Sequence, residues 1–429
     1  MNYKQAIDFL FSSLPMYQRT GKVAYKSSLK NTLALDEYFG YPHRNFRSIH
    51  IAGTNGKGSV AHMLAAVLQT VGYRTGLYTS PHLTDFRERI RIDGEMIPED
   101  RVTGFVRDHK AIIEEIKPSF FEMTVAMAFD HFNREKVDIA VVEVGMGGRL
   151  DSTNIIQPLL SVITNIGMDH NQFLGDTMYQ IAREKSGIMK PGIPVLIGQK
   201  QDEVSIVFIK RAQELGCNLH FADQDMQVEY SLKSPGNKQI MQVYSEGEPY
   251  LKSLETDLLG FYQKKNILTV LKAIEILSGN DIKVTEQQLR RGLANIVELT
   301  GLRGRWEILG SNPLIIADTA HNPEGMKEVI EQIKQMPWKN LHIIIGMVDD
   351  KDPGKLLALL PPEAKYYFCQ ASIPRAMDRE ELARKALKFG LYGQLCPSPE
   401  RAFEIARSAA SENDLIFIGG STFLVAELV

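Results

Sequence analysis

Short apolar runs alternate with stretches of helical periodicity along most of this chain. The apolar runs read as buried strands at residues 48–51, 75–79, 137–144, 159–164 and 193–197. Stretches typical of helices lie between them, for example at residues 98–116, 121–135 and 176–187. Strands that alternate with helices pair mainly in parallel, because each helix carries the chain back across the sheet. The pattern therefore predicts an α/β fold on a mainly parallel sheet.

The alternation stops near residue 300 and then starts again. Further strands are predicted at residues 314–317, 341–345, 366–369 and 415–418, with helices near 324–335, 379–388 and 398–409. At 429 residues the chain is too long for one compact core. We predict a first domain at residues 1–297, a linker at residues 298–306 and a smaller α/β domain at residues 307–429.

Residues 222–256 depart from the alternation. This segment is polar and irregular, and the Ser-Pro-Gly-Asn sequence at residues 234–237 is typical of a turn. We expect it to form hairpins at the edge of the first sheet.

Charge and composition argue against several classes of protein. The chain has 49 Lys and Arg residues against 52 Asp and Glu residues, so a net charge of -3 gives no global attraction to nucleic acid or anionic membrane. No apolar stretch approaches the roughly 18 residues of a membrane helix, and residues 1–21 lack the apolar core of a signal peptide. Cys217, Cys369 and Cys396 are too few and too widely spaced for a disulfide framework or a zinc cluster. We expect a cytoplasmic monomer that acts on small molecules, with neither nucleic acid nor membrane as a partner.

A glycine-rich loop follows the first predicted strand and precedes a predicted helix. Its sequence is Gly53-Thr54-Asn55-Gly56-Lys57-Gly58-Ser59. Backbone N–H groups and the helix dipole converge on an anion in such a place, and Lys57 would reach the outer phosphates of a nucleotide. The spacing departs from the Walker pattern, which has four residues between its glycines and Ser or Thr directly after the lysine. A plain glycine turn is the alternative, but the combination favours an ATP site.

Several segments, in order along the chain, resemble the signatures of the Mur-ligase superfamily and, within it, of folylpolyglutamate and dihydrofolate synthases. They are residues 53–60 with 79–83, then 142–154, 164–170, 181–192 and 318–323, and, more weakly, Gly419-Gly420-Ser421. The resemblance implies an N-terminal P-loop-type domain on a mainly parallel sheet and a smaller Rossmann-like α/β domain at the C-terminal end.

The resemblance also implies an activity. ATP would phosphorylate a carboxylate, an amine of L-glutamate would attack the acyl phosphate, and phosphate would leave to give an amide. The sequence Arg149-Leu150-Asp151-Ser152 resembles that of members that accept dihydropteroate, which favours a bifunctional enzyme of folate biosynthesis and one-carbon metabolism. Polyglutamylation of folates alone, or another Mur-type amino-acid ligase, are the alternatives.

The family assigns two magnesium ions to positions that this chain preserves. Ser80 and Glu143 match ligands of the first ion, His170 matches a ligand of the second, and Lys185 matches a lysine carbamylated by CO₂. Three of these residues have a simpler alternative. Glu143 would cap the turn after its strand, His170 would be structural, and Lys185 would be a surface lysine paired with Glu184 or Asp176.

Other matches concern nucleotide and substrates. Asn266 and Arg305 match residues that contact ATP, while Asp318 and His321 match residues that hold nucleotide and place the incoming glutamate; a helix N-cap is the alternative for Asp318. The expected catalytic set is Lys57, Glu143, His170, Lys185 and His321. The expected substrate set is His82, Arg89, Ser119, Phe121, Asp151, Ser152, His321 and Ser421. For Arg89 the alternative is a solvated basic stretch with Arg87 and Arg91, and for Phe121 it is core packing.

Two other functions compete. A non-enzymatic nucleotide switch would have a regular Walker loop and an Asn-Lys-x-Asp sequence, but residues 165–169 read Asn-Ile-Gly-Met-Asp. A cell-wall Mur ligase would carry a further domain before the loop, and the residues before Gly53 are too few for one.

Overall fold

The computed structural model describes residues 1–15, 28–169, 171–233, 238–279, 281–349 and 353–429. The chain divides into two compact units. Unit 1 comprises Met1–Asp257 and Gln263–Leu302, and unit 2 comprises Leu258–Tyr262 and Arg303–Val429. The short segment Leu258–Tyr262 therefore belongs to unit 2 although both of its flanks belong to unit 1.

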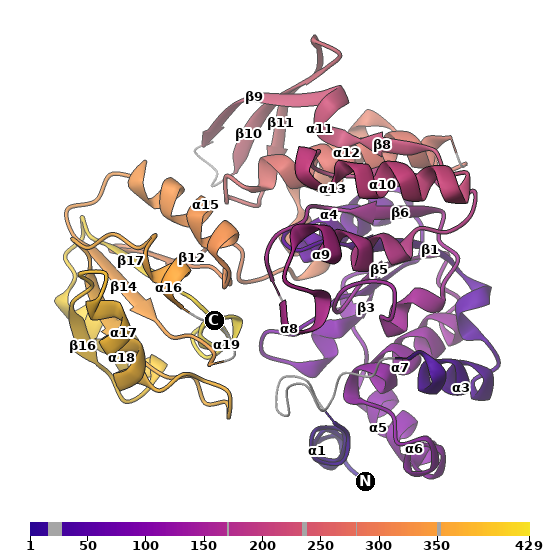
Figure 1. The fold of residues 1–429 in the computed structure, drawn as a ribbon, viewed down its shortest axis with the longest axis horizontal. Helices are drawn as coiled ribbons and strands as arrows, with labels where there is room; N and C mark the ends of the chain where they lie inside the picture. The colour runs from indigo at the N-terminus through magenta and orange to yellow at the C-terminus, as the bar shows by residue number, and fades with distance from the viewer. Residues whose placement is uncertain (16–27, 170, 234–237, 280, 350–352) are drawn as a thin grey trace. The chain divides into compact units, whose positions relative to one another are not determined.

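Unit 1 is built on an eight-stranded sheet (Figure 1). In the order β4-β3-β2-β5-β1-β6-β7-β8, its strands are Glu95–Met96, Ile90–Ile92, Thr75–Tyr78, Ile139–Glu143, Arg47–Ala52, Leu160–Ile163, Val195–Ile197 and Leu219–Phe221. The pairs from β2 to β8 are parallel, and the two pairings at one edge, β2–β3 and β3–β4, are antiparallel. The predicted mainly parallel sheet is thus confirmed, and its central strands β1, β5 and β6 are buried except at Arg47, the first residue of β1.

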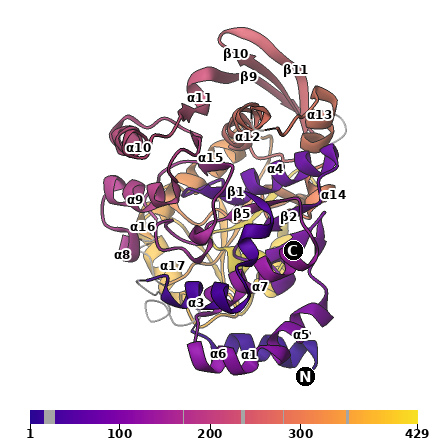
Figure 2. The same cartoon turned by 90° about the vertical axis from the view of Figure 1, so that its right-hand side faces the viewer.

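Helices cover both faces of this sheet. The α-helices of unit 1 among the described residues are α1 (Tyr3–Ser13), α3 (Lys30–Tyr38), α4 (Lys57–Val71), α5 (Glu99–Asp108), α6 (Lys110–Ile116), α7 (Phe120–Arg134), α8 (Asn171–Leu174), α9 (Met178–Lys185), α10 (Asp202–Leu215), α11 (Ala222–Asp225), α12 (Gln263–Ser278), α13 (Glu286–Ala294) and α14 (Ile296–Thr300). Figure 2 shows α4 and α12 on one side of β1 and β5, with α7 on the other. The helix expected at residues 98–116 is broken at His109, whose backbone leaves the helical region at φ -113° and ψ 16°.

A second, antiparallel sheet in unit 1 corrects the expectation for residues 222–256. Strands β9 (Met226–Lys233), β10 (Gln239–Ser245) and β11 (Glu248–Thr256) form hairpins, as expected, but they make a sheet of their own in the order β11-β10-β9. They do not extend the edge of the main sheet, because β9 packs on α11 and α12 and β11 packs on α13. The turn expected at residues 234–237 lies outside the described residues.

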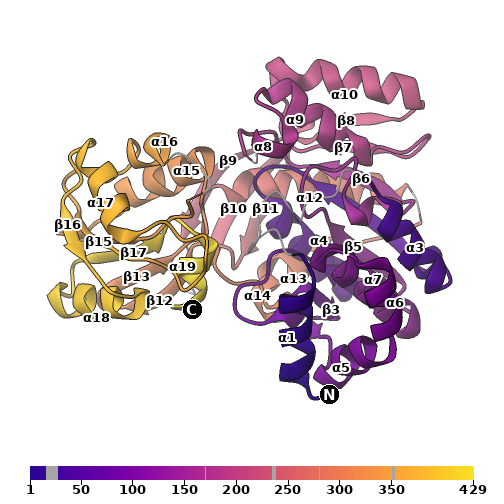
Figure 3. The ribbon, with the colours of Figure 1, turned by 60° about the horizontal axis from the view of Figure 1, so that its bottom comes forward.

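Unit 2 has a six-stranded sheet in the order β12-β13-β17-β14-β15-β16. In that order the strands are Glu307–Ser311, Leu314–Ala317, Leu415–Gly419, Leu341–Ile345, Lys365–Phe368 and Gly393–Leu395. All neighbours are parallel except β12 and β13. The helices are α15 (Pro323–Lys334), α16 (Gly354–Leu357), α17 (Arg379–Leu387), α18 (Pro399–Ala409) and α19 (Thr422–Ala426). Figure 3 shows α17 and α18 on opposite faces of the sheet, which is the expected Rossmann-like layering.

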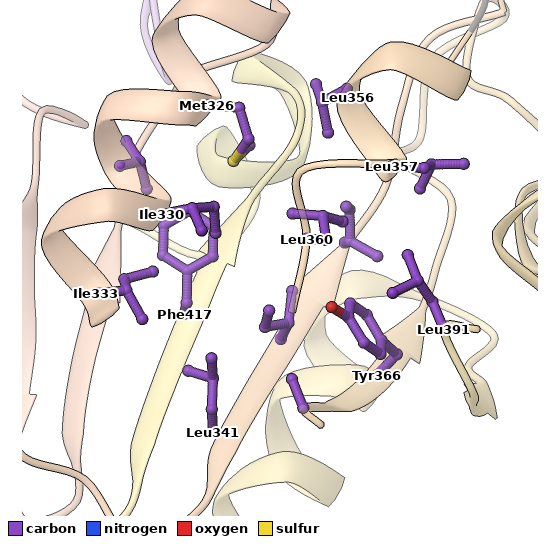
Figure 4. Close-up of a cluster of buried hydrophobic side chains, with 14 of the residues drawn as sticks. Met326, Ile330, Ile333, Leu341, Leu356, Leu357, Leu360, Tyr366, Leu391 and Phe417 are labelled. Carbon is purple, nitrogen blue, oxygen red and sulfur yellow. The ribbon is translucent and has the colours of Figure 1, made fainter. Parts of the chain in front are cut away.

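The core of unit 2 lies between the sheet and helices α15, α16 and α17. Met326, Ile330 and Ile333 of α15 face Phe417 of β17, as Figure 4 shows. Leu259, from the separate segment of this unit, belongs to the same cluster. Within the described residues, no helix combines the length and the apolar character needed to cross a bilayer.

Candidate active site

The glycine-rich loop joins β1 to α4. Gly53 and Gly56 have φ values of +146° and +85°, which L side chains rarely adopt. A Cβ on Gly53 would collide with the side chain of Thr164, and one on Gly56 would collide with the amide of Asn266. Both glycines are therefore required by backbone conformation and by close neighbours, and α4 begins directly after them at Lys57.

Residues that follow β6 hold this loop. The Thr54 N–H donates to the Asn165 carbonyl oxygen, and the Asn55 N–H donates to Asn165 Oδ1, both at 2.9 Å. The Thr164 hydroxyl donates to the Asn55 carbonyl oxygen at 2.5 Å. The Gly167 N–H donates to Thr54 Oγ1 at 2.8 Å. The loop conformation is thus fixed by a neighbouring strand end before any ligand binds.

Two lysines converge on one carbonyl oxygen of the loop. Lys57 Nζ lies 3.0 Å from Gly53 O and 3.1 Å from Thr54 O, and Lys185 Nζ lies 2.8 Å from Gly53 O. Lys185 is only 4% exposed, which contradicts the surface-lysine alternative. Burial, reinforced by the charge of Lys57, lowers the pKa of Lys185 to about 7. A substantial fraction of this amine is therefore neutral near pH 7.

Glu143 and Ser80 meet at the carboxyl ends of neighbouring parallel strands. The Ser80 N–H donates to Glu143 Oε2 at 3.1 Å, and Glu143 is 4% exposed. The pairing of β1 with β5 sets Ile51 beside Glu143, just before the glycine loop. A buried carboxylate with a serine residue beside it suits Mg²⁺, which takes oxygen ligands and keeps several waters. His170, the expected ligand of a second ion, lies outside the described residues.

The described ranges contain no group of three or more His, Cys, Asp or Glu residues placed to hold a metal ion.

His82, which is partly exposed, and Arg89, which is buried, form a pair among aromatic rings. Arg89 is 3% exposed, so the alternative of a solvated residue is wrong for it. Its Nε donates to His82 Nδ1 at 2.7 Å, and its guanidinium lies 5.3 Å from the centroid of the Phe120 ring. Burial, together with the charge of Arg89, lowers the pKa of His82 to about 3. His82 is therefore neutral, with its proton on Nε2.

Ser119 and Phe121 stand at the start of α7. Ser119 is the N-cap: Glu122 N–H donates to Ser119 Oγ at 3.2 Å, and Ser119 N–H donates to Glu122 Oε2 at 2.6 Å. The ring of Phe121 lies against Gly145, where a Cβ would collide with it. Phe121 thus touches the glycine turn that follows Glu143.

Asp151 and Ser152 are both 6% exposed. The Asp151 carboxylate accepts hydrogen bonds from Met146 N–H at 2.9 Å and from Thr153 N–H at 3.0 Å. Burial raises the pKa of Asp151, against the effect of these donors. Phe121 and Asp151, which come from two separate parts of unit 1, therefore both contact one glycine turn, Gly145–Gly148.

Two side-chain hydrogen bonds link Asn266 to the glycine-rich loop. Its Nδ2 donates to Gln263 Oε1 at 2.7 Å, and Gln263 Nε2 donates to Ser59 Oγ at 3.2 Å. All three side chains are buried. The structure thus brings Asn266 together with Gly56 and Ser59 of the loop.

In unit 2, Asp318 directly follows β13 and is 2% exposed. Its Oδ2 accepts from the Tyr262 hydroxyl at 2.6 Å and from Trp306 N–H at 2.8 Å, and its Oδ1 accepts from Ala320 N–H at 2.8 Å. The N-cap of α15 is Asn322, so Asp318 does not have the capping role given as its alternative. Burial raises the pKa of both Asp318 and Tyr262, and the phenol therefore stays a donor.

Three further candidates lie near Asp318 in the sequence or at the end of unit 2. Arg305 donates to the Thr319 hydroxyl and, at 3.2 Å, to the Gly304 carbonyl oxygen. His321 is exposed, with Nδ1 at 3.0 Å from the Thr319 carbonyl oxygen. Ser421 is the buried N-cap of α19.

Some residues that build the site received no role from the sequence. Thr164 and Asn165 hold the loop, Gln263 links Asn266 to Ser59, and Tyr262 binds Asp318. The only local signal was a Thr-Asn pair directly after a buried strand. The partners of these side chains lie far away in sequence and become visible only in the fold.

Comparisons with known proteins agree with this geometry. Residues 51–274 match the family model "Mur ligase middle domain", and residues 304–422 match "Mur ligase, glutamate ligase domain". The folylpolyglutamate synthase of Lacticaseibacillus casei is 32% identical over 99% of this chain and 97% of its own length. The dihydrofolate synthase/folylpolyglutamate synthase of Bacillus subtilis is 30% identical over 95% of each chain.

A longer relative and a solved structure are also similar to this chain. The chain spans half the length of a probable bifunctional folylpolyglutamate synthase/dihydropteroate synthase of Haloferax volcanii, at 32% identity. The structure of Escherichia coli FolC in complex with DHPP and ADP superposes with a TM-score of 0.87 at 26% identity, over 100% of this chain and 97% of that one.

Proposed function

The chain belongs to the Mur ligase family, in the branch of the folylpolyglutamate and dihydrofolate synthases, and we propose that it joins L-glutamate to dihydropteroate and to folate glutamates at the expense of ATP. The products are the amide, ADP and phosphate. The observation that carries this proposal is the cluster of Lys57, Lys185, Glu143 and Ser80 around the loop. Fixed cations and a metal-binding carboxylate at a nucleotide loop suit transfer of a phosphoryl group between anions.

In this mechanism the loop Gly53 to Ser59 holds the phosphates of ATP. Its N–H groups and Lys57 reduce the repulsion between the γ-phosphate and the acceptor carboxylate. The acceptor oxygen attacks the γ-phosphorus, ADP leaves, and an acyl phosphate forms. The glutamate amine then attacks the acyl carbon, and phosphate departs as the amide closes. Asn266 supports this loop from α12, next to Gly56.

Magnesium would supply charge neutralisation for the transferred phosphoryl group. We propose that Ser80 and Glu143 hold the first ion and that His170 contributes to a second. We also propose that Lys185 reacts with CO₂ to become an anionic carbamate ligand. Its burial and its pKa of about 7 support this step, because only the neutral amine can react with CO₂.

Residues of unit 2 are proposed to serve the nucleotide and the glutamate. Arg305 and Asp318 would contact ATP, and His321 and Ser421 would place the incoming amino acid. The rigid setting of Asp318, with three donors on its carboxylate, supports a positioning role. The functional division into residues 1–297, 298–306 and 307–429 belongs to the same proposal.

The acceptor would lie against His82, Arg89, Ser119, Phe121, Asp151 and Ser152. Arg89 offers a charge for an acceptor carboxylate, and Phe121 offers an aromatic face. The bifunctional names of relatives such as the Bacillus protein support both acceptors. The Lacticaseibacillus relative is named folylpolyglutamate synthase only, which favours polyglutamylation alone as the second candidate. We propose further that the protein is a monomer and that it is cytoplasmic; the three free cysteines support a reducing compartment.

One assay tests the reaction and the acceptor together. The purified full chain receives ATP, Mg²⁺ and L-glutamate, with either dihydropteroate or tetrahydrofolate, and phosphate release and product mass are measured. We expect product with both acceptors and no product without glutamate. Tetrahydrofolate as the only productive acceptor would reduce the proposal to polyglutamylation. Phosphate release that needs neither acceptor nor glutamate would overturn it.

Two variants test the cluster itself. Lys57→Ala and Glu143→Ala should abolish amide formation while the circular dichroism spectrum stays that of the parent protein. Near-normal turnover in either variant would contradict the assignment of the site.

A further inference from the structure

A buried histidine in the centre of the main sheet is hydrogen-bonded to the turn that follows β5. His50 lies on β1, between Val142 of β5 and Ser161 of β6, and is fully buried. Its Nε2 lies 2.8 Å from Thr153 Oγ1. Thr153, also fully buried, donates its hydroxyl to Asp151 Oδ1 at 2.5 Å. Three side chains thus form a continuous chain from the sheet to a carboxylate.

The proton positions along this chain follow from the donors. The Asp151 carboxylate can only accept hydrogen bonds, and it does so from two backbone N–H groups. The single hydroxyl proton of Thr153 therefore points to Asp151. Thr153 Oγ1 must then accept from His50, which carries its proton on Nε2. Burial lowers the pKa of His50 to about 3, so the ring stays neutral.

A histidine at position 50 lowers the stability of the folded protein relative to an apolar residue. Its other nitrogen, Nδ1, is buried and has no hydrogen-bond partner among the described residues. A valine or leucine would fill a central strand without leaving a polar atom unsatisfied. The hydrogen bond to Thr153 is therefore the feature that distinguishes histidine from an apolar residue here.

The series of hydrogen bonds from His50 through Thr153 to Asp151 ends at the turn Gly145–Gly148. Asp151 Oδ2 accepts the Met146 N–H at 2.9 Å and so fixes this turn. On one side Gly145 lies against the ring of Phe121. On the other side a Cβ on Gly148 would lie 2.9 Å from the carbonyl oxygens of Glu184 and Lys185. A shift of the turn would therefore displace Phe121, Asp151 or the end of α9.

We infer that His50 and Thr153 are positioning residues of the acceptor site: they hold Asp151, and through it the turn Gly145–Gly148, where the acceptor must seat. The inference rests on the proposed function, since it takes Asp151 and Phe121 as acceptor-binding residues. The two residues do not touch the substrate. They set the place and orientation of groups that do, from a rigid strand that also leads into the phosphate loop.

Thr153→Val tests this inference, because valine has nearly the same shape without the hydroxyl. We expect the KM for dihydropteroate and for tetrahydrofolate to rise roughly ten- to hundred-fold, the range expected for the loss of a hydrogen bond to a charged group. The KM for ATP should stay within about twofold, because the loop is held separately by Thr164 and Asn165. Thr153→Ser, which keeps the hydroxyl, should restore the parent value.

His50 gives an independent pair of variants. His50→Leu should raise the acceptor KM as Thr153→Val does, and His50→Gln should recover part of the loss because its amide can donate to Thr153. Thr269→Val is the matched control. It removes another buried hydroxyl of unit 1, one that donates to the Lys265 carbonyl oxygen on α12 at 3.0 Å.

The outcomes separate the inference from the proposed function. An acceptor KM unchanged in Thr153→Val, with normal turnover of the parent protein, would overturn only the inference. So would equal losses for ATP and acceptor, or losses matched by Thr269→Val, since these indicate a general loss of stability. A parent protein that forms no product with either acceptor would overturn the proposed function and the inference with it.

Discussion

Replacement of Lys185 by methionine should stabilise the folded protein while it removes the ligase activity. Lys185 Nζ is buried and donates only to the Gly53 carbonyl oxygen at 2.8 Å among the hydrogen bonds of the described residues. Methionine fills a similar volume without a charge. The Gly53 oxygen keeps its hydrogen bond from Lys57, so no carbonyl is left unsatisfied.

The size of the effect follows from the pKa of Lys185. The difference between 10.5 and about 7, at 1.36 kcal/mol per pH unit, corresponds to a cost of about 5 kcal/mol for the charged amine in the folded state. Loss of the hydrogen bond to Gly53 offsets about 1 kcal/mol. Relaxation and water penetration lower the cost of a buried charge further. We therefore expect the unfolding free energy to rise by about 2 kcal/mol at pH 7.

The pH dependence gives the sharper test. Below the folded pKa of about 7 the amine is charged in both states, and the full cost is present. Between that value and 10.5 the unfolded chain binds a proton that the folded chain does not, so the stability of the parent protein rises with pH. The advantage of Lys185→Met should therefore be largest near neutral pH and shrink as the pH rises.

Differential scanning calorimetry measures this difference in magnesium-free buffers purged of CO₂, so that the amine stays unmodified. The parent protein and Lys185→Met are compared between pH ~6.5 and ~9.5. Lys210→Met, which replaces an exposed lysine of α10, is the control for loss of a lysine as such. A variant that is less stable than the parent, or a difference that does not change with pH, would refute the reasoning.

Substitutions at three further positions, Gly56, Ser119 and Tyr262, test single contacts. Gly56→Ala should weaken ATP binding at least about tenfold in titration calorimetry, because φ is +85° at this position and the added Cβ would collide with Asn266. Gly72→Ala is the control: φ is +102° there, but the space around the added Cβ is open, so this variant should bind ATP normally. Ser119→Ala should lower the thermal midpoint, because the N-cap of α7 contributes about 1 kcal/mol. Ser119→Asp should keep the cap but raise the KM for the acceptor. An unchanged KM in Ser119→Asp would show that Ser119 does not contact the acceptor. Tyr262→Phe should lower the unfolding free energy of unit 2 by about 1–3 kcal/mol, because the Asp318 carboxylate loses one of its donors. Both tryptophans of the chain lie in unit 2 and report that transition by fluorescence, and an unchanged midpoint would contradict the importance of this bond.

The sequence predicted those parts of the fold that depend on local pattern. Strands such as Leu314–Ala317 and Leu341–Ile345 are mainly apolar runs, and their predicted bounds agree with the structure. The break at His109 was not predictable, because its ring packs against Phe39 and Phe105 from distant and neighbouring segments. The independent sheet β9–β11 escaped prediction for a similar reason. A hairpin is a local feature, whereas the surface on which it packs is not.

The candidate site likewise combines features that the local sequence predicts with contacts that depend on the fold. The glycine loop and the carboxylate that ends β5 are local features, and the structure sets them near each other through the β1–β5 pairing. The burial of Lys185, which decides its protonation, depends on helix α9 packing beneath the loop. The His82–Arg89 hydrogen bond likewise needed the fold. Sequence can name the groups, but the charge state of each depends on neighbours that only tertiary structure supplies.

The placement of Leu258–Tyr262 in unit 2 has a consequence for how the protein is made and how it can be divided. During synthesis these residues emerge long before residues 303–429, so the hydrophobic core that includes Leu259 and the bond from Tyr262 to Asp318 cannot close until the last strands have left the ribosome. A gene fragment that begins at residue 303 would lack both. Exchange of unit 2 between homologous enzymes by one crossover would also leave Leu258–Tyr262 behind. A functional chimera therefore requires the exchange of two segments, Leu258–Tyr262 and Arg303–Val429.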